Sequence, residues 1–419
     1  MGLIHKIPGS EAWEVIPALR KEEIQPRSGR IDLQELYGQA RSCIDDHGGP
    51  DGIITHWDFP GPSLVSLLCR DYGLPGATPE AVAKCEHKYW MRLEQRKISS
   101  KQTPEIGAVN PFTPDEGKKR VPQYPFWLKP VKGHSSMLGF MVEDDDDLKE
   151  ALHECRRKIH LLGEPFNEFL AQVGNTEDLD KIDGNYAIAE SLISAKRQFT
   201  LEGYVWHGET VVYGAVDSIR EGRYGSSFSR YQYPSSVPEA VLAKAKKITA
   251  AFLSHIGYDG SPFNVEFFWN PETDALNLLE INPRISKSHS PLFHMVDGAS
   301  HHKIAIDLAL GRKPKFPQRK GKDKLAAKFM LRSHEADGII KRVPSEKEID
   351  ELKRILPDID VNILVEKEDQ LSALFYQDSY TYELVEVFIG GEDEEMLEDA
   401  YARCIDSLPI FIKPMPKAL

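Results

Sequence analysis

The fold is decided by two runs, Phe263-Asn264-Val265-Glu266-Phe267-Phe268-Trp269 and Leu276-Asn277-Leu278-Leu279-Glu280-Ile281-Asn282-Pro283-Arg284. A segment rich in turn formers joins them, so together they predict a β-hairpin. Because side chains alternate across a strand, Glu280 and Asn282 share one face, and Glu266 of the first strand is expected beside Glu280. Arg284 continues that row if the strand persists past Pro283.

This row gathers two carboxylates and an amide oxygen. The hydrophobic flanks of both strands favour burial, where the carboxylates repel each other unless a cation lies between them. Hard oxygen ligands suit Mg²⁺ or Mn²⁺, with water and phosphate oxygens completing the coordination. We therefore predict a metal site at Glu266, Glu280 and Asn282, with Arg284 binding a phosphate or carboxylate. The alternative is a solvated hairpin with scattered salt bridges.

Composition narrows the class of protein. At 419 residues the chain predicts two or three domains. Its net charge of −13 argues against nucleic acid or an anionic membrane surface as the main partner. No apolar run is long enough to span a bilayer, and no signal peptide is evident. The five widely spaced cysteines are typical of a reducing compartment, so we expect a cytoplasmic protein.

The N-terminal third reads as alternating helix and strand. Apolar spacing predicts a helix over Ile31–Ile44, a strand over Asp51–Trp57 and a helix over Ser63–Cys69. This order predicts a small layer of parallel strands and helices. The loop His56–Gly61 would then follow a strand end, where such layers often bind ligands, although an ordinary turn is the alternative.

A helix predicted over Ala81–Arg96 carries Lys84, Lys88 and Arg92 on one face. Taken alone, such a face is typical of a solvated surface. Later, the polar segment from Arg220 to Ser236 predicts either a mobile active-site loop or a disordered surface loop.

The hairpin resembles the metal-binding hairpin of the ATP-grasp superfamily, and other segments resemble further parts of that family. The resemblance implies that Lys88 and Lys129 contact the nucleotide phosphates. It also implies that the segment after Lys129 is the phosphate-covering loop, and that Tyr186–Ile193 is the hinge that borders the adenine ring. The remaining nucleotide contacts implied are Gly133, Ser135, Ser136, Gly139, Glu190, Leu192, Ile193 and Glu202. Without the resemblance, the loop would be an ordinary turn and the glutamates ordinary strand charges.

The implied fold is α/β, of the α+β ATP-grasp type. Residues 1–86 would form a Rossmann-like domain, and residues 87–315 the ATP-grasp domain with a mobile lid at about 123–189. Residues 316–419 would form a C-terminal α+β domain. Candidate substrate contacts are Arg230, Lys287, Ser288 and His289, although a lone histidine is more often structural.

The resemblance implies a carboxylate–amine ligase of the biotin-carboxylase-like or L-amino-acid ligase branch. Such an enzyme uses ATP and Mg²⁺ to form an amide or peptide bond through an acyl phosphate, releasing ADP and phosphate. Arg284 and Lys129 would be its catalytic residues, small-molecule carboxylates and amines its substrates, and a homodimer its assembly. The alternatives are a biotin carboxylase-type enzyme that activates bicarbonate, and a non-catalytic nucleotide-binding protein.

Overall fold

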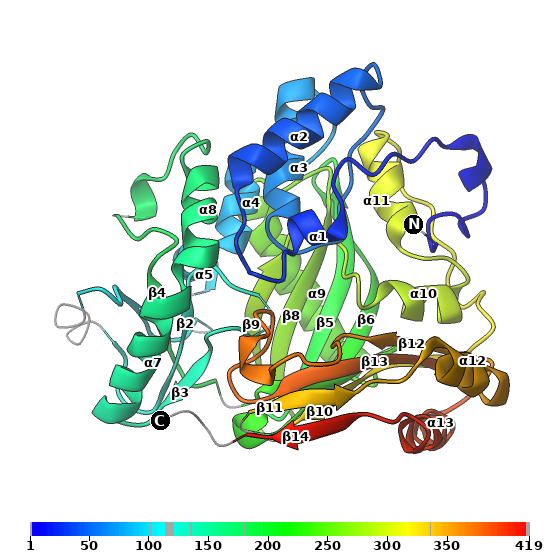
Figure 1. Cartoon of the computed structure of the whole chain (residues 1–419). Helices are drawn as coiled ribbons and strands as arrows, with labels where there is room; N and C mark the ends of the chain where they lie inside the picture. Colours follow the sequence, from blue (N-terminus) through cyan, green and yellow to red (C-terminus); the bar gives the residue numbers. More distant parts are fainter. Residues whose placement is uncertain are drawn as a thin grey trace.

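The computed structural model describes residues 2–99, 103–113, 121–134, 136–179, 181–193, 195–335 and 337–415. Helices near the N-terminus pack over one end of the central strands, a lid lies to one side, and the C-terminal strands cross the base (Figure 1). Within the described residues, no helix is long and apolar enough to cross a membrane.

The first hundred residues form helices, and no strand precedes β1 in the described part of the chain. These elements are η1 (Ser10–Ala12), α1 (Lys21–Ile24), α2 (Leu33–Asp46), α3 (Gly61–Tyr72), α4 (Pro79–Glu86) and α5 (Lys88–Ser99). The strand predicted at Asp51–Trp57 was wrong, and with it the Rossmann-like layer. The first 86 residues contain only this one strand-like run, so it has no neighbour to pair with. It packs instead against α11 (His302–Ala309), so closely that a Cβ at Gly52 would lie 2.7 Å from the carbonyl oxygen of Ala309.

The single helix predicted over Ala81–Arg96 is two helices, α4 and α5, separated at His87. The backbone of His87 is extended, with φ −85° and ψ 96°, and its buried ring lies 3.1 Å from the carbonyl oxygen of Ile182. This break turns the axis of the chain and makes Lys88 the first residue of α5.

The lid consists of a four-stranded antiparallel sheet in the order β1-β4-β2-β3, with helices beside it. Its elements are β1 (Ile106–Val109), β2 (Phe126–Pro130), β3 (Phe140–Val142), α7 (Asp145–Lys158), α8 (His160–Leu170), η3 (Glu177–Leu179) and β4 (Ala187–Ser191). Asp144 caps α7 by accepting hydrogen bonds from the backbone N–H groups of Asp146 and Asp147.

The central sheet has eight antiparallel strands in the order β12-β13-β10-β7-β6-β5-β8-β9. Its strands are β5 (Arg197–Trp206), β6 (Glu209–Glu221), β7 (Ser227–Tyr233), β8 (Pro262–Asn270), β9 (Ala275–Asn282), β10 (Leu325–Ser333), β12 (Ile359–Ile363) and β13 (Tyr382–Gly391). The other elements are η4 (Arg223–Gly225), α9 (Glu239–His255), α10 (Ser290–Asp297), β11 (Gly338–Arg342), α12 (Glu346–Ile355), η5 (Leu371–Ala373), α13 (Glu394–Asp406) and β14 (Phe411–Pro414). The main core, which includes Phe199, Phe252 and Phe267, packs this sheet against α3, α4 and α9.

The mobile loop predicted from Arg220 to Ser236 was wrong. Most of these residues belong to the β6–β7 hairpin, whose turn is η4. The polar, serine-rich pattern concealed a strand, because β7 pairs with β10 almost a hundred residues further along the chain.

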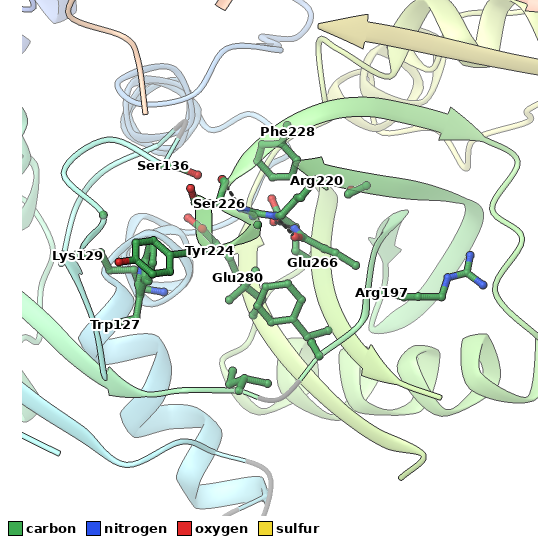
Figure 2. Close-up of a pocket in the computed structure, with 18 of the residues that line it drawn as sticks. Trp127, Lys129, Ser136, Arg197, Arg220, Tyr224, Ser226, Phe228, Glu266 and Glu280 are labelled. Carbon is green, nitrogen blue, oxygen red and sulfur yellow. Dashed lines mark hydrogen bonds between the residues drawn. The ribbon is translucent and has the colours of Figure 1, made fainter. Parts of the chain in front are cut away.

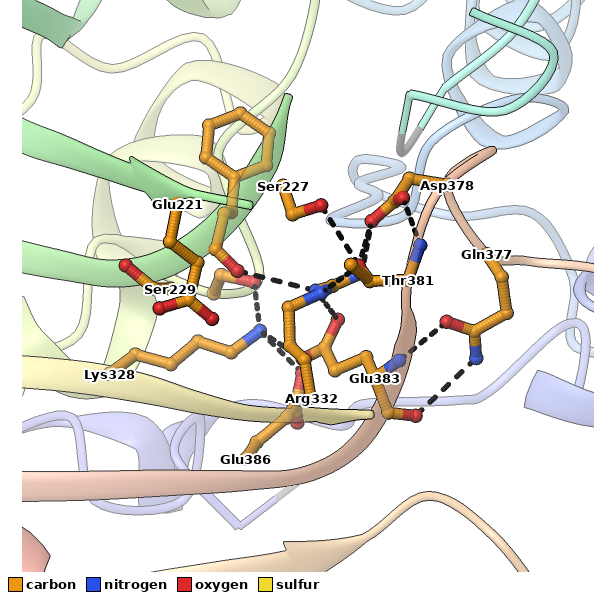
Figure 3. Close-up of polar contacts among 12 residues, drawn as sticks. Glu221, Ser227, Ser229, Lys328, Arg332, Gln377, Asp378, Thr381, Glu383 and Glu386 are labelled. Carbon is orange, nitrogen blue, oxygen red and sulfur yellow. Dashed lines mark hydrogen bonds and ion pairs between the residues drawn. The ribbon is translucent and has the colours of Figure 1, made fainter. Parts of the chain in front are cut away.

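The C-terminal strands extend the central sheet and are anchored to it by buried charges (Figure 3). The guanidinium of Arg332 donates to the carboxylate of Asp378 at 2.6 Å and to Thr381 Oγ1 at 2.7 Å. It also donates to Glu383 and to the carbonyl oxygen of Phe228, both at 3.3 Å. Since Phe228 borders the cavity described below, this cluster links the C-terminal segment to that cavity.

We predict that Arg332→Met lowers the free energy of unfolding by about 3–5 kcal/mol, because it leaves the buried carboxylate of Asp378 without its cation. Arg332 and Asp378 side chains are only 5% and 2% exposed. Denaturant titration would measure the change. Arg403→Met is the matched control, because its pair with Asp399 is more than half exposed and spans 3.7 Å. Equal midpoints for the two variants would contradict the anchoring role.

Candidate active site

A cavity of about 660 Å³ lies between the lid and the central sheet. Lid residues such as Trp127 and Lys129 form one wall, while Glu266, Glu280 and Arg220 project from the sheet opposite (Figure 2). The predicted site residues that line it are Lys88, Lys129, Gly133, Ser136, Gly139, Glu190, Leu192, Ile193, Glu266 and Glu280. Ser135 lies outside the described residues.

The predicted hairpin forms, as β8 and β9, and brings the two carboxylates together. Glu266 and Glu280 are direct cross-strand partners, and Asn264 and Asn282 form the next pair. The amide nitrogen of Asn282 lies 3.4 Å from Glu266 Oε1 and 3.1 Å from Asn264 Oδ1. The hairpin thus has the face that the sequence predicts, and the metal-binding role of its side chains stays a prediction.

Burial and the facing charge of Glu280 raise the pKa of Glu266 to about 7. Burial would also raise the pKa of Glu280, but the ammonium of Lys88, 2.7 Å away, and the charge of Lys129 hold it below its usual value. The hairpin therefore carries one firmly ionised carboxylate and one that titrates near neutrality. A divalent cation between them would relieve the repulsion.

Within the residues described, no group of three or more His, Cys, Asp or Glu side chains has the arrangement of a metal site. The predicted set instead combines two carboxylates with an amide. A set with so few protein ligands fits Mg²⁺, which usually keeps waters and substrate phosphates in its coordination shell.

A glutamine and an arginine that the sequence did not single out lie against this hairpin. Gln198 donates from Nε2 to Glu266 Oε2 at 2.7 Å, and its Oε1 accepts from Arg220 Nε at 2.5 Å. The guanidinium of Arg220 lies 3.9 Å from the ring centroid of Phe228, and burial lowers its pKa. In the sequence, Gln198 could have been found only from the alternation of β5, which places it on the same strand face as Glu202.

The two lysines predicted to contact phosphates are held by carboxylates of the same cavity. Lys88 Nζ donates to Glu280 and, at 2.6 Å, to the carbonyl oxygen of Gly133 in the loop after β2. Lys129 Nζ lies 2.8 Å from Glu190 Oε2, and burial lowers its pKa. The basic helix face was therefore not a solvated surface, since Lys88 is almost completely buried.

Apolar groups cover the end of the cavity near the hinge. Leu192 and Ile193 follow β4, and Trp127, Met141 and Phe268 line the cavity with them. Such a lining suits a flat aromatic ring. Glu190, predicted near the adenine or ribose, uses both carboxylate oxygens on Lys129 and Arg92 instead.

Glu202 does not line the cavity. Its side chain is fully buried, accepts from Asn264 Nδ2 at 2.7 Å, and lies 2.7 Å from His289 Nδ1 and 3.8 Å from His301 Nδ1. It lies opposite Asn264, one row beyond Glu266, where α10 and α11 cover the sheet. His289, a candidate substrate contact, is thus a buried partner of Glu202.

The other predicted substrate contacts also lie outside the cavity lining. Arg230 pairs with Glu394 at 2.6 Å and Glu398 at 3.0 Å, which ties β7 to α13. Ser288 Oγ accepts from Lys328 Nζ at 3.2 Å.

Arg284 and Lys287 face the loop His56–Gly61. Arg284 Nε donates to Asp58 Oδ1 at 2.9 Å, and the guanidinium holds the pKa of that carboxyl at about 2 although burial would raise it. Lys287 Nζ lies 4.6 Å from the ring centroid of Trp57. The loop is therefore more than a turn, because its residues neutralise or cover both cations that follow the β8–β9 hairpin.

Comparison with known proteins assigns the domain that holds this cavity. The family model described as the ATP-grasp domain matches residues 122–291, a range that includes the phosphate-side loop, the hinge and the hairpin. The chain contains an ATP-grasp domain. This confirms the resemblance and, apart from the Rossmann-like layer, the ATP-grasp fold class that it implies.

The relatives of this chain are distant. The carbamoyl phosphate synthase large chain, N-terminal section, of Aquifex aeolicus is 25% identical over 303 residues, covering 70% of this chain and 48% of that protein. The chain spans about half the length of the curated relatives it matches. An L-amino acid ligase from Bacillus licheniformis superposes with a TM-score of 0.66 at 16% identity, covering 91% of this chain and 85% of that one. A biotin carboxylase from Campylobacter jejuni gives 0.57 at 14% identity, covering 90% and 79%.

We predict that Mn²⁺ binds this ATP-grasp chain about ten-fold more weakly at pH 6 than at pH 8. A cation needs both glutamates ionised, and with a pKa of about 7 Glu266 is mostly protonated at pH 6. Calorimetric titration at the two pH values would measure this. Glu266→Gln should remove most of the dependence on pH, whereas Glu239→Gln, at an exposed position of α9, should retain it. Equal affinity at both pH values in the unmodified chain would contradict the assignment.

Proposed function

We propose that the chain is an ATP-dependent carboxylate–amine ligase that forms an amide or peptide bond through an acyl phosphate. The observation that carries the proposal is the meeting, around one cavity, of the Glu266–Glu280 pair with Lys88 and Lys129. Two acidic and two basic side chains are suited to a magnesium-bound triphosphate. Its charge needs both a metal and ammonium groups.

In the first step a substrate carboxylate oxygen attacks the γ-phosphorus of ATP. The bond from that phosphorus to the β–γ bridging oxygen breaks, and ADP leaves. Little covalent chemistry is required of the protein, so its task is positioning and charge neutralisation. Lys129 from the lid and Lys88 from α5 would stabilise the phosphate oxygens. Glu266, Glu280 and Asn282 would hold Mg²⁺, which would supply a Lewis acid to offset the phosphate charge.

In the second step an amine nitrogen attacks the carbonyl carbon of the acyl phosphate. Phosphate leaves and the nitrogen loses a proton, which gives the amide. Arg284 would hold the reacting carboxylate and then the tetrahedral oxyanion. Enclosure between lid and sheet would keep water from the acyl phosphate. Asp58, paired with Arg284, would have to yield part of that guanidinium to the substrate.

The test incubates the protein with ATP, Mg²⁺ and a panel of carboxylates and amines, with amino acids first. The release of ADP and phosphate is then measured. We expect release only when an acid and an amine are both present, and a product whose mass equals their condensation. Release that requires bicarbonate and biotin instead would establish the biotin carboxylase-type alternative. ATP binding without release under any condition would favour a non-catalytic nucleotide-binding protein.

We predict that Glu280→Ala leaves the chain folded and lowers turnover by more than about a hundred-fold. The variant removes a metal ligand and the carboxylate that holds Lys88, and such charge stabilisation is worth several kcal/mol in the transition state. Circular dichroism would verify folding, and ADP release would measure turnover. Glu239→Ala is the exposed control. Wild-type turnover in Glu280→Ala would refute the metal assignment.

A further inference from the structure

Helix α5 carries a second buried cation, Arg92, one turn beyond Lys88 and outside the cavity lining. Residues four apart lie on the same helix face, so Arg92 follows Lys88 toward the seam between lid and sheet. Its side chain is 0% exposed. A guanidinium stays charged at any physiological pH, so burial on this scale requires partners for its N–H groups.

Every nitrogen of the Arg92 guanidinium has a partner, and the partners come from three elements. Nε donates to Glu190 Oε1 on β4 at 2.6 Å. Nη1 donates to Gln95 Oε1 within α5 at 2.7 Å and to the carbonyl oxygen of Leu278 on β9 at 2.8 Å. Nη2 donates to the carbonyl oxygen of Leu279 at 3.0 Å. One side chain thus joins the lid, the helix and the metal-site strand.

The second carboxylate oxygen of Glu190 contacts Lys129. Glu190 Oε2 accepts from Lys129 Nζ, so a continuous chain of contacts runs from Arg92 through Glu190 to Lys129. On the other side, Leu279 immediately precedes Glu280. A shift of Arg92 would therefore move both Lys129 and Glu280.

We propose that Arg92 is a positioning residue that fixes Glu190, and through it Lys129, relative to the β9 metal strand. In this arrangement Glu190 orients Lys129 and does not bind the adenine ring. The inference rests on the proposed function for its effect on turnover, whereas its effect on ATP binding requires only the cavity. A lysine at this position could not replace Arg92, because one ammonium cannot reach acceptors on β4, α5 and β9 together.

The decisive experiment is a double-mutant cycle on ATP affinity, measured by calorimetry with ATP and Mg²⁺. Arg92→Met alone should weaken ATP binding roughly ten-fold. In a Lys129→Met background the same change should have little further effect, because the lysine that Arg92 positions is gone. Arg96→Met is the matched control, since Arg96 lies one turn further on the same helix and is exposed. Additive effects, or equal affinity in Arg92→Met and Arg96→Met, would overturn the inference.

A second variant keeps the inference testable if Arg92→Met does not fold. Glu190→Gln conserves shape but removes the carboxylate charge from Lys129. The charged groups that face Lys129 are Glu190 and Glu280, which raise its pKa, and Arg92 and Lys88, which lower it. Without the Glu190 charge the lysine should deprotonate at lower pH. The alkaline loss of ATP affinity should then begin roughly one pH unit earlier than in the wild type.

The outcomes separate this inference from the proposed function. Wild-type protein that binds no ATP would refute the proposed function itself. Wild-type protein that binds ATP, with an unchanged pH profile in Glu190→Gln and an additive cycle for Arg92, would refute the positioning role alone. A non-additive cycle, which shows that Arg92 and Lys129 are coupled, together with the earlier alkaline loss of affinity would establish that Arg92 and Glu190 act through Lys129.

Discussion

Two glutamates that face each other across the β8–β9 hairpin are the constraint on which the site depends. Like charges directly opposite on a sheet destabilise it, and burial in a cavity wall strengthens the repulsion. The surrounding elements relieve it in different ways. Helix α5 delivers Lys88 to Glu280, and β5 places the amide of Gln198 against Glu266. Burial and the remaining repulsion from Glu280 raise the pKa of Glu266, and a cation between the two carboxylates would relieve that repulsion.

The second constraint is the seam between two sheets. The lid sheet and the central sheet share no strand, so the cavity between them is defined only by side chains that cross it. Arg92 and Lys88 cross from the same helix, and both contact β9. Each also contacts a lid residue, Glu190 or Gly133, so α5 bridges the lid and strand β9 through these two side chains.

The sequence predicted correctly those elements whose pattern lies within one short segment of the chain. The hairpin follows from period-2 alternation around a turn, and that period alone places Glu266 beside Glu280. Arg92 was read as solvated because a basic helix face looks the same whether its partners are water or distant strands. The β6–β7 hairpin was missed for a related reason, since its serine-rich second strand is stabilised by β10 far along the chain. Asp51–Trp57 had local strand character but no neighbour to complete a ladder.

The predicted substrate contacts show why adjacency in sequence was a poor guide to a shared site. Lys287, Ser288 and His289 are consecutive, yet they contact Trp57, Lys328 and Glu202, in three separate groups. The side chain best suited to a substrate carboxylate is Arg284, and it is already paired with Asp58. In the proposed reaction a carboxylate that approaches Arg284 would replace one acidic partner by another. The desolvation of Arg284 is already met in the folded chain, but Asp58 would lose its cation unless it moved to solvent. In the proposed reaction, recognition of the carboxylate would therefore depend on how readily the loop His56–Gly61 withdraws Asp58, which would link the N-terminal helices to substrate binding.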